Sequence, residues 1–259
     1  MSTDIGAPLK PRSWRVPMMA SLILWCIAWE VVGRIGAVFI LPPFSEVLAR
    51  IPELVATPTW QRATLTTLWT FSVGMVFAVV IGITLGVLMG RSRIADRLLG
   101  VWVNLFVSAP LSALVPVLMI LFGLGETTVI VTVFLFAVWI IVLDVRAGVL
   151  HVSPSLVEMA RSYGASRTQL YGKVIFWAAL PEILAGLRVG LIRGVKGVVV
   201  GQLLVAIIGY GELFELYSRS FDMPRFWALT ILLFGAALAL SALIGILEKQ
   251  FGYYAGVRS

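Results

Sequence analysis

The run TLTTLWTFSVGMVFAVVIGITLGVLMG, residues 64–90, contains no charged side chain. A helix that crosses the hydrocarbon core of a bilayer needs about 20 mostly apolar residues, so this run is long enough to span a membrane. Inside lipid the backbone must satisfy its own hydrogen bonds, which an α-helix does within a single segment. The run therefore predicts a membrane-spanning helix.

Other apolar runs of similar length lie on both sides of this one. They cover residues 16–37, 98–123, 127–149, 181–208 and 226–247. The run at 181–208 is unusual because it contains Arg188, Arg193 and Lys196, and each cation is costly inside a bilayer. Together with residues 64–90, these runs predict an all-α, polytopic membrane protein with about six transmembrane helices.

The composition supports a membrane location and excludes several classes of function. Of the 259 residues, 60% are hydrophobic and 13% are charged, whereas a soluble domain carries about 25% charged residues. The net charge of +7 could indicate a nucleic-acid partner, but the basic residues lie between the apolar runs, where the positive-inside rule accounts for them. A single cysteine, Cys26, and a single histidine, His151, leave no disulfide, no metal-ligand cluster and no Cys/His nucleophile pair. We expect the lipid bilayer as a partner, and no nucleic acid, metal, cofactor or catalytic activity.

The distribution of lysine and arginine predicts the orientation. Basic residues concentrate in the N-terminal tail, after the second run, between the fourth and fifth runs, and after the last run: Lys10, Arg12, Arg15, Arg91, Arg93, Arg97, Arg161, Arg167, Lys173, Lys249 and Arg258. Because cytoplasmic segments are enriched in such residues, both termini are expected in the cytoplasm, which agrees with an even number of spans. The expected organisation is a cytoplasmic tail at 1–15, a transmembrane domain at 16–251 and a second tail at 252–259. The first apolar run is expected to stay as a signal anchor.

The cytoplasmic loop between the fourth and fifth runs carries helix-boundary signals. Ser153 or Ser155 can cap a first helix, and Glu158 stands where a capping box anchored on Ser155 would place its acid. Gly164 is expected to end that helix, and Ser166 to cap a second one. The loop therefore predicts a helix–turn–helix across the cytoplasmic mouth, with small side chains at the turn that let a partner approach closely.

The same loop, about residues 151–180, resembles the EAA loop of ABC-importer permeases. That pattern is Glu-Ala-Ala, then a glycine, then a hydrophobic residue shortly before Leu-Pro. The matching residues here are Glu158, Ala160, Gly164, Val174, Leu180 and Pro181, with Met159 in place of the first alanine. Further stretches resemble the nitrate/sulfonate/taurine-type branch of that family: residues 41–43, 109–116, 122–126, 163–167 and 179–188. The resemblance extends, in the family's order, from Leu41 to Lys249.

The resemblance implies a type I ABC-importer permease fold in the bacterial cytoplasmic (inner) membrane. In such permeases the loop forms a coupling helix that docks into a groove of a separate ATPase subunit. The expected contact residues are Glu158, Ala160, Gly164, Ala165 and Ser166. The expected partners are two ATP-binding subunits, a second permease copy that makes a homodimer, and a periplasmic or extracellular solute-binding protein. No G-x-x-x-x-G-K-[ST] phosphate loop occurs in the sequence, which agrees with ATP hydrolysis in a partner.

The fifth run has a glycine side and a cationic side. At about 100° per residue, its glycines fall within an arc of about 80°, which suits close helix packing. They are Gly186, Gly190, Gly194, Gly197 and Gly201. Lys196 and Arg193 lie on the other side, where we expect them to line the translocation pathway and favour an anionic solute. The alternative is that they pair with acids from other spans, such as Asp144 or Glu30.

Further positions are assigned to the pathway or to helix packing. Pro110 and Pro116 interrupt the third run, and freed carbonyls are tolerated only beside protein or water, so this break is expected next to the pathway. Gln202 stands where many members of the resembled family carry Glu, and it is placed on the pathway too. A second glycine stripe comprises Gly82, Gly86 and Gly90. This stripe would pack either within the subunit or across a dimer.

Two other classes of membrane protein are alternatives to the ATP-driven importer permease. A secondary transporter or channel working without ATP would need ion-coupling acids inside its spans, and only Glu30 and Asp144 qualify, both near span ends. A membrane-embedded enzyme would need a polar catalytic cluster at the interface, which one histidine does not supply. The importer permease is therefore the preferred interpretation.

Overall fold

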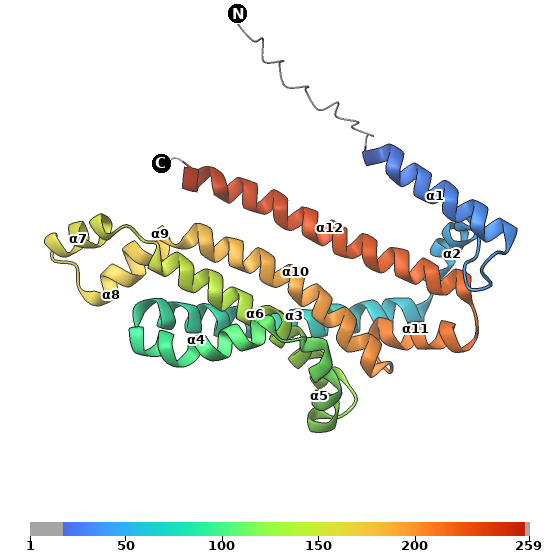
Figure 1. Ribbon diagram of the computed structural model, residues 1–259, viewed down its shortest axis with the longest axis horizontal. Coiled ribbons are helices and arrows are strands. Elements are labelled where there is room, and N and C mark those ends of the chain that lie inside the picture. The colour runs from blue at the N-terminus through green and yellow to red at the C-terminus, as the bar shows by residue number, and fades with distance from the viewer. Residues whose placement is uncertain (1–17, 257–259) are drawn as a thin grey trace, which may run out of the picture.

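The computed structural model describes residues 18–256, and every regular element in that range is a helix. In chain order (Figure 1) they are α1 (Met18–Ile35), α2 (Phe44–Ala56), α3 (Pro58–Arg91), α4 (Arg93–Ser108), the 3₁₀ turn η1 (Leu111–Leu114), α5 (Val115–Phe122), α6 (Glu126–Leu150), α7 (Pro154–Ser162), α8 (Arg167–Gln169), the π-helical turn η2 (Leu170–Ile175), α9 (Phe176–Ala178), α10 (Leu180–Val205), α11 (Gly209–Arg219) and α12 (Met223–Gly256). The predicted tail at 1–15 and the last three residues of the second tail lie outside the described residues.

Three helices within residues 18–256 are long and apolar enough to cross a membrane, or up to five if each of two bent pairs counts as one span. The three are α3, α6 and the Met223–Leu240 part of α12. The bent pairs are α4 with η1 and α5, at 95°, and the Arg167–Ala178 segment with α10, at 62°. The predicted all-helical, polytopic fold is confirmed. A helix, α1, forms where the first span was predicted. Among the described residues, however, α1 is not one of the helices that are long and apolar enough to count as a candidate span.

The centre of the molecule is α6, which packs against α3 and against α10 (Figure 1). Rows of glycine on α3 and α10 make this close packing possible. A Cβ added at Gly82 would lie 2.7 Å from Ile141 Cγ2, and one added at Gly86 would lie 2.7 Å from Val145 Cβ. From the α10 side, a Cβ at Gly190 would lie 2.5 Å from Ile141 Cγ1. The predicted glycine side of the fifth run is therefore a packing surface, and the stripe of the second run packs within the subunit.

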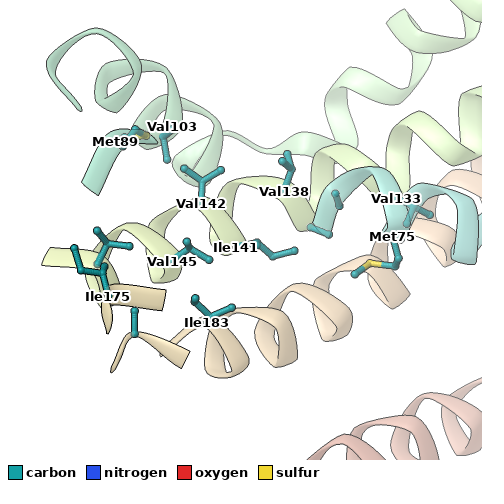
Figure 2. Packing of buried hydrophobic residues seen from close by; sticks show 14 of the residues in the cluster. Met75, Met89, Val103, Val133, Val138, Ile141, Val142, Val145, Ile175 and Ile183 are labelled. Carbon is teal, nitrogen blue, oxygen red and sulfur yellow. The ribbon is translucent and has the colours of Figure 1, made fainter. Parts of the chain in front are cut away.

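The residues of α6 that meet these glycines are mostly β-branched. Figure 2 shows them between the surrounding helices, and each is fully buried: Val133, Val138, Ile141, Val142 and Val145. A β-branched side chain is stiff at χ1 and fills space in one rotamer, so it suits a contact against bare backbone. Glycine on two helices and branched side chains on the third together form the main core.

The third predicted span is sharply bent rather than straight. α4 ends before Pro110, whose backbone (φ −73°, ψ 82°) leads into η1. A proline disfavours the helical conformation in the residue before it, and Ala109 is accordingly extended, with ψ 145°. Pro116 lies within the first two positions of α5, where proline is tolerated. The predicted interruption of the third run therefore forms: the chain leaves the α-helix before Pro110 and resumes it in α5, with Pro116 in the first turn.

A second, smaller core lies at the end of the molecule opposite α7 and α8 (Figure 1), where α2, α11 and the start of α12 meet. Two tryptophans fix the α1–α2 connection there. Trp29 Nε1 donates to Pro42 O at 3.0 Å, and Trp227 Nε1 donates to Ile40 O at 2.8 Å. The two indole rings also meet edge to face, with centroids 5.1 Å apart. Such amphipathic rings suit the boundary between lipid and water.

Glu30, at the far end of α1, caps the next helix. Its carboxylate accepts the Ser45 N–H at 2.8 Å and the Ser45 hydroxyl at 2.9 Å, and it pairs with Arg34 at 2.5 Å. A carboxylate at a helix N-terminus satisfies backbone donors that have no partner within the helix. The alternative in which Glu30 pairs with Arg193 or Lys196 is therefore wrong.

Candidate functional site

The loop between α6 and α10 folds as the predicted helix–turn–helix. Gly164 ends the first helix with a left-handed backbone, φ +76°. Its N–H donates to Arg161 O at 2.9 Å. The Ala165 N–H reaches back to Ala160 O at 3.0 Å, which closes the helix end in the manner of a Schellman motif. Glycine adopts this conformation without the cost that a side chain would add.

The two helix starts of the loop differ from each other. Ser166 Oγ accepts the Gln169 N–H at 3.3 Å, and Gln169 Oε1 accepts the Ser166 N–H at 2.9 Å, so the predicted cap forms as a complete capping box. At α7 the N-cap is Ser153, which makes no side-chain bond to the helix and instead pairs with Ser155 Oγ at 2.7 Å. The predicted capping role of Glu158 is therefore wrong, and its carboxylate is exposed.

Most of the predicted contact set lies on the surface of this loop, at one tip of the molecule (Figure 1). Glu158, Gly164 and Ser166 are exposed, and Ala165 is half-buried. Ala160 is the exception at 7% exposure, so it packs inside the loop instead of presenting itself to a partner. Four of the five predicted residues are thus at least partly exposed on the loop, and the fifth is buried.

Two larger exposed side chains in the same loop are not among the contact residues predicted from the sequence. Tyr163 is 88% exposed and Met159 is 52% exposed. Both residues lie outside the candidate spans, and large apolar groups exposed in such a place are typical of an interaction surface. The signal was present in the sequence, because Tyr163 directly precedes the turn glycine and Met159 replaces an alanine of the EAA pattern.

The loop is anchored to the membrane helices by a shared core. Ala160, Leu170 and Ile175 belong to the same buried cluster as Val145 and Val149 of α6. Their side chains connect both helices of the loop to the end of α6, so the exposed surface has a defined position relative to the spans.

The cations Lys196 and Arg193 of α10 differ in their surroundings. Lys196 is exposed, although α10 belongs to one of the two bent pairs that could cross a membrane. Arg193 is half-buried, and its charge acts on the carboxylate of Asp144 in α6. A lysine ammonium is not stable against lipid, so the surface that carries Lys196 must face water or another protein chain.

Gln202 is a packing residue in this structure, not one that lines a pathway. It is 1% exposed, and its Oε1 accepts the Thr67 hydroxyl at 3.0 Å and the Tyr210 N–H at 3.2 Å. One side chain thereby joins α10, α3 and α11. Burial raises the pKa of the Tyr210 phenol, against the opposing effect of its hydrogen bond with Thr64, so the phenol is neutral. The prediction that Gln202 lines the pathway is therefore corrected.

A cavity of about 270 Å³ lies between α3, α4 and α6. Its polar wall consists of Asn104 and the ion pair between Asp96 and Arg146. Arg146 Nη2 donates to Asp96 Oδ2 at 2.8 Å, and its Nε donates to Oδ1. Among residues 18–256, no group of three His, Cys, Asp or Glu side chains is placed to hold a metal ion.

Comparison with known proteins identifies the family. Residues 78–253 match the family described as the binding-protein-dependent transport system inner membrane component. The chain belongs to this family. The permease is 30% identical to the taurine transport system permease protein TauC of Escherichia coli K12, over 95% of its own length and 93% of that protein. It is 28% identical to the riboflavin transport system permease protein RibX of Chloroflexus aurantiacus, over 90% and 87%. It is 26% identical to the putative aliphatic sulfonates transport permease protein SsuC of Bacillus subtilis 168, over 93% and 89%.

Solved ABC transporters share the fold of the permease. A chain of the MetNI methionine ABC transporter, in an inward-facing conformation, matches with a TM-score of 0.61 and 25% identity, covering 74% of the permease and 94% of that chain. A chain of an amino acid ABC transporter matches with a TM-score of 0.58 and 18% identity, covering 72% and 89%. The predicted permease fold and the predicted function are confirmed: this is an inner-membrane permease subunit of an ABC transporter.

Proposed function

We propose that the permease couples solute import to ATP hydrolysis in a separate subunit through the surface formed by Glu158, Met159, Tyr163, Gly164, Ala165 and Ser166, here called the docking surface. The observation that carries this proposal is an 88% exposed tyrosine in the same loop as an exposed glutamate. The turn after this tyrosine has a defined shape, because hydrogen bonds close the end of α7 and the start of α8. Aromatic side chains are enriched in interfaces, and the small residues beside Tyr163 let a partner backbone come close. Ala160 is buried and packs in the cluster that holds the loop on α6.

The other partners and the orientation belong to the same proposal. The permease is a non-catalytic translocation subunit that works with two ATPase subunits, a second permease copy and a solute-binding protein on the outer side. Both termini lie in the cytoplasm, with the docking surface. The basic residues around the α3–α4 turn and along the loop support this orientation, because the positive-inside bias places them on the cytoplasmic side.

Glu158→Lys is expected to stop the ATPase subunit from co-purifying with a tagged permease and to reduce ATP-dependent uptake by about tenfold or more, because like-charge contacts in an interface cost several kcal/mol. The matched control is Glu126→Lys, the same charge change at another exposed residue. Glu126 lies in the first turn of α6, whereas the loop with Glu158 follows the last turn of that helix. It is expected to leave both measurements unchanged. The experiment also tests the orientation, because an ATPase reaches the loop only from the cytoplasm.

If Glu158→Lys keeps both the ATPase and the uptake, the docking proposal fails. Uptake that then follows an ion gradient instead of ATP would favour the alternative of a secondary transporter.

We further propose that the solute is an anion and that Lys196 lines its route, with Arg193 close by. Lys196 is an exposed cation on a spanning helix, and such a group requires a wet or protein-lined surface. The relatives include permeases named for taurine and for aliphatic sulfonates, both of which carry a sulfonate group. The pathway runs beside the bend at Pro110, where the exposed proline leaves the backbone open.

Lys196→Met is expected to lower uptake of sulfonate-bearing solutes about tenfold, because a buried or half-desolvated charge pair is worth more than a kcal/mol. Taurine, an alkanesulfonate and riboflavin are suitable probes in membrane vesicles that contain the complete transporter. Lys196→Arg keeps the charge and is expected to retain most of the uptake. Unchanged uptake together with an unchanged preference for anions in Lys196→Met contradicts the assignment.

A further inference from the structure

Two contacts hold the turn between α3 and α4 from either side. The guanidinium carbon of Arg91, the last residue of α3, lies 4.4 Å from the centroid of the Tyr171 ring in the loop. In the first turn of α4, the Asp96 carboxylate receives two hydrogen bonds from Arg146 of α6. One contact joins the turn to the loop, and the other joins it to the helix from which the loop emerges.

Tyr171 belongs to a stretch with unusual backbone geometry. Between the short helices α8 and α9, η2 is a π-helix, a rare form that is frequent at functional sites. Its end residues Leu170 and Ile175 are buried, at 4% and 8% exposure, whereas Tyr171 is half-buried. The Tyr171 ring therefore lies at the edge of the packed part of the loop, with Arg91 over its face. Rewinding this stretch into an α-helix, which has fewer residues per turn, would rotate the ring away from Arg91.

The path from this contact to the spans is short. Ser92 alone separates α3 from α4, and its extended backbone (φ −122°, ψ 116°) caps α4. A displacement of Arg91 is therefore passed to the first turn of α4 without an intervening flexible loop. From there α4 forms one wall of the cavity that contains Asn104, and it leads to the 95° bend.

We propose that Arg91 and Tyr171 are positioning residues that transmit movement of the loop to α4, while the Asp96–Arg146 pair keeps the start of α4 on α6. This inference rests on the proposed function, since it takes the docking surface as the origin of the movement. For such transmission η2 must have a second arrangement besides the π-helical form in which Arg91 lies over the Tyr171 ring, and this contact favours the π-helical form.

The first test measures hydrogen exchange in the purified permease alone. In Tyr171→Leu and in Arg91→Gln, the amides of residues 170–175 are expected to exchange about fivefold faster, the size of effect that a single cation–π contact supports. Tyr171→Phe keeps the ring face and is expected to keep the protection. Arg93→Gln removes an exposed arginine from the same turn and serves as the matched control with unchanged exchange.

The second test uses the permease bound to its ATPase subunit, with and without a non-hydrolysable ATP analogue. In the unaltered protein and in Tyr171→Phe, the nucleotide is expected to change the exchange of residues 93–108. In Tyr171→Leu and in Arg91→Gln, this change is expected to be lost although the ATPase still co-purifies. The double variant is expected to be no worse than either single one, because both remove the same contact.

Three results would overturn the inference. One is a defect in Tyr171→Phe as large as that in Tyr171→Leu, because the hydroxyl rather than the ring would then matter. A second is a normal nucleotide response in both contact variants, because the contact would then be merely structural. The third is loss of the ATPase from Tyr171→Leu, which would place Tyr171 in the docking surface. Failure of the proposed function is distinguishable from these three results, because in that case the ATPase subunit would still co-purify with the Glu158→Lys permease.

Discussion

Gly86→Val is expected to remove most of the folded permease from the membrane, whereas Gly235→Val leaves its amount unchanged. A Cβ on Gly86 would lie 2.7 Å from Val145 Cβ and 2.9 Å from Val142 O. The second of these atoms is backbone of α6, so α3 and α6 must move apart to make room, and the core between them opens. Overpacking of this kind costs about 1–3 kcal/mol or more of the free energy of unfolding, a large part of what holds a native protein together.

The measurement is the amount of monodisperse protein in detergent extracts, followed by its thermal unfolding midpoint. Gly235 is the matched control because it lies in α12 with no atom within 4 Å of an added Cβ. Gly86→Ala is expected to fall between the two, since it adds one methyl group to the same contact. A Gly86→Val protein that accumulates and melts like the unaltered one would show that α3 and α6 are not packed as described.

Gly211→Ala is expected to destabilise the connection between α10 and α11 even though it adds a single methyl group. The added Cβ would lie 1.9 Å from the carbonyl oxygen of Gln202 and 2.6 Å from its carbonyl carbon. Both atoms are backbone, so relief requires α11 to move away from α10. That movement would break the hydrogen bond that Gln202 accepts from the Tyr210 N–H, with an expected cost of about 2–4 kcal/mol from the overlap and the lost hydrogen bond together.

Thermal unfolding and protease cleavage between residues 206 and 211 measure this effect. Gly125→Ala is the control: that glycine lies between α5 and α6, its φ of 162° is extended backbone open to any residue, and an added Cβ meets no atom within 4 Å. Equal stability and equal protease resistance in the two variants would mean that α11 does not lie against the end of α10.

The broad plan of the molecule follows from short-range signals in its sequence. Hydropathy locates the spans, and Gly164 and Ser166 mark the turn of the loop because helix ends depend on a few neighbouring residues. The glycine stripe of α10 was predictable for the same reason, since helical periodicity puts its members on one side. In each of these cases the deciding information lies within a few turns of one helix.

The remaining features depend on residues far apart in the chain. Because Gln202 is polar, it is assigned to the pathway on sequence alone. In the structure it is buried and hydrogen-bonded to Thr67 and Tyr210. From the sequence, Glu30 is a possible partner for the cations of α10. In the structure its carboxylate instead accepts hydrogen bonds from Ser45 and caps α2. The π-helical turn was not predicted from the sequence, and its end residues Leu170 and Ile175 are buried in the same cluster as residues of α6, far away in the chain.

The two glycine rows around α6 have a mechanical consequence. Bare backbone of α3 and α10 lies against branched side chains of α6, so a lengthwise shift of any of the three helices would drive a side chain into backbone. These helices must therefore turn together as a rigid block during the transport cycle. Flexing is left to segments outside the block, among them the 95° bend beside Pro110 and the connection from Ala206, with φ 58°, to Gly209, with φ 59°.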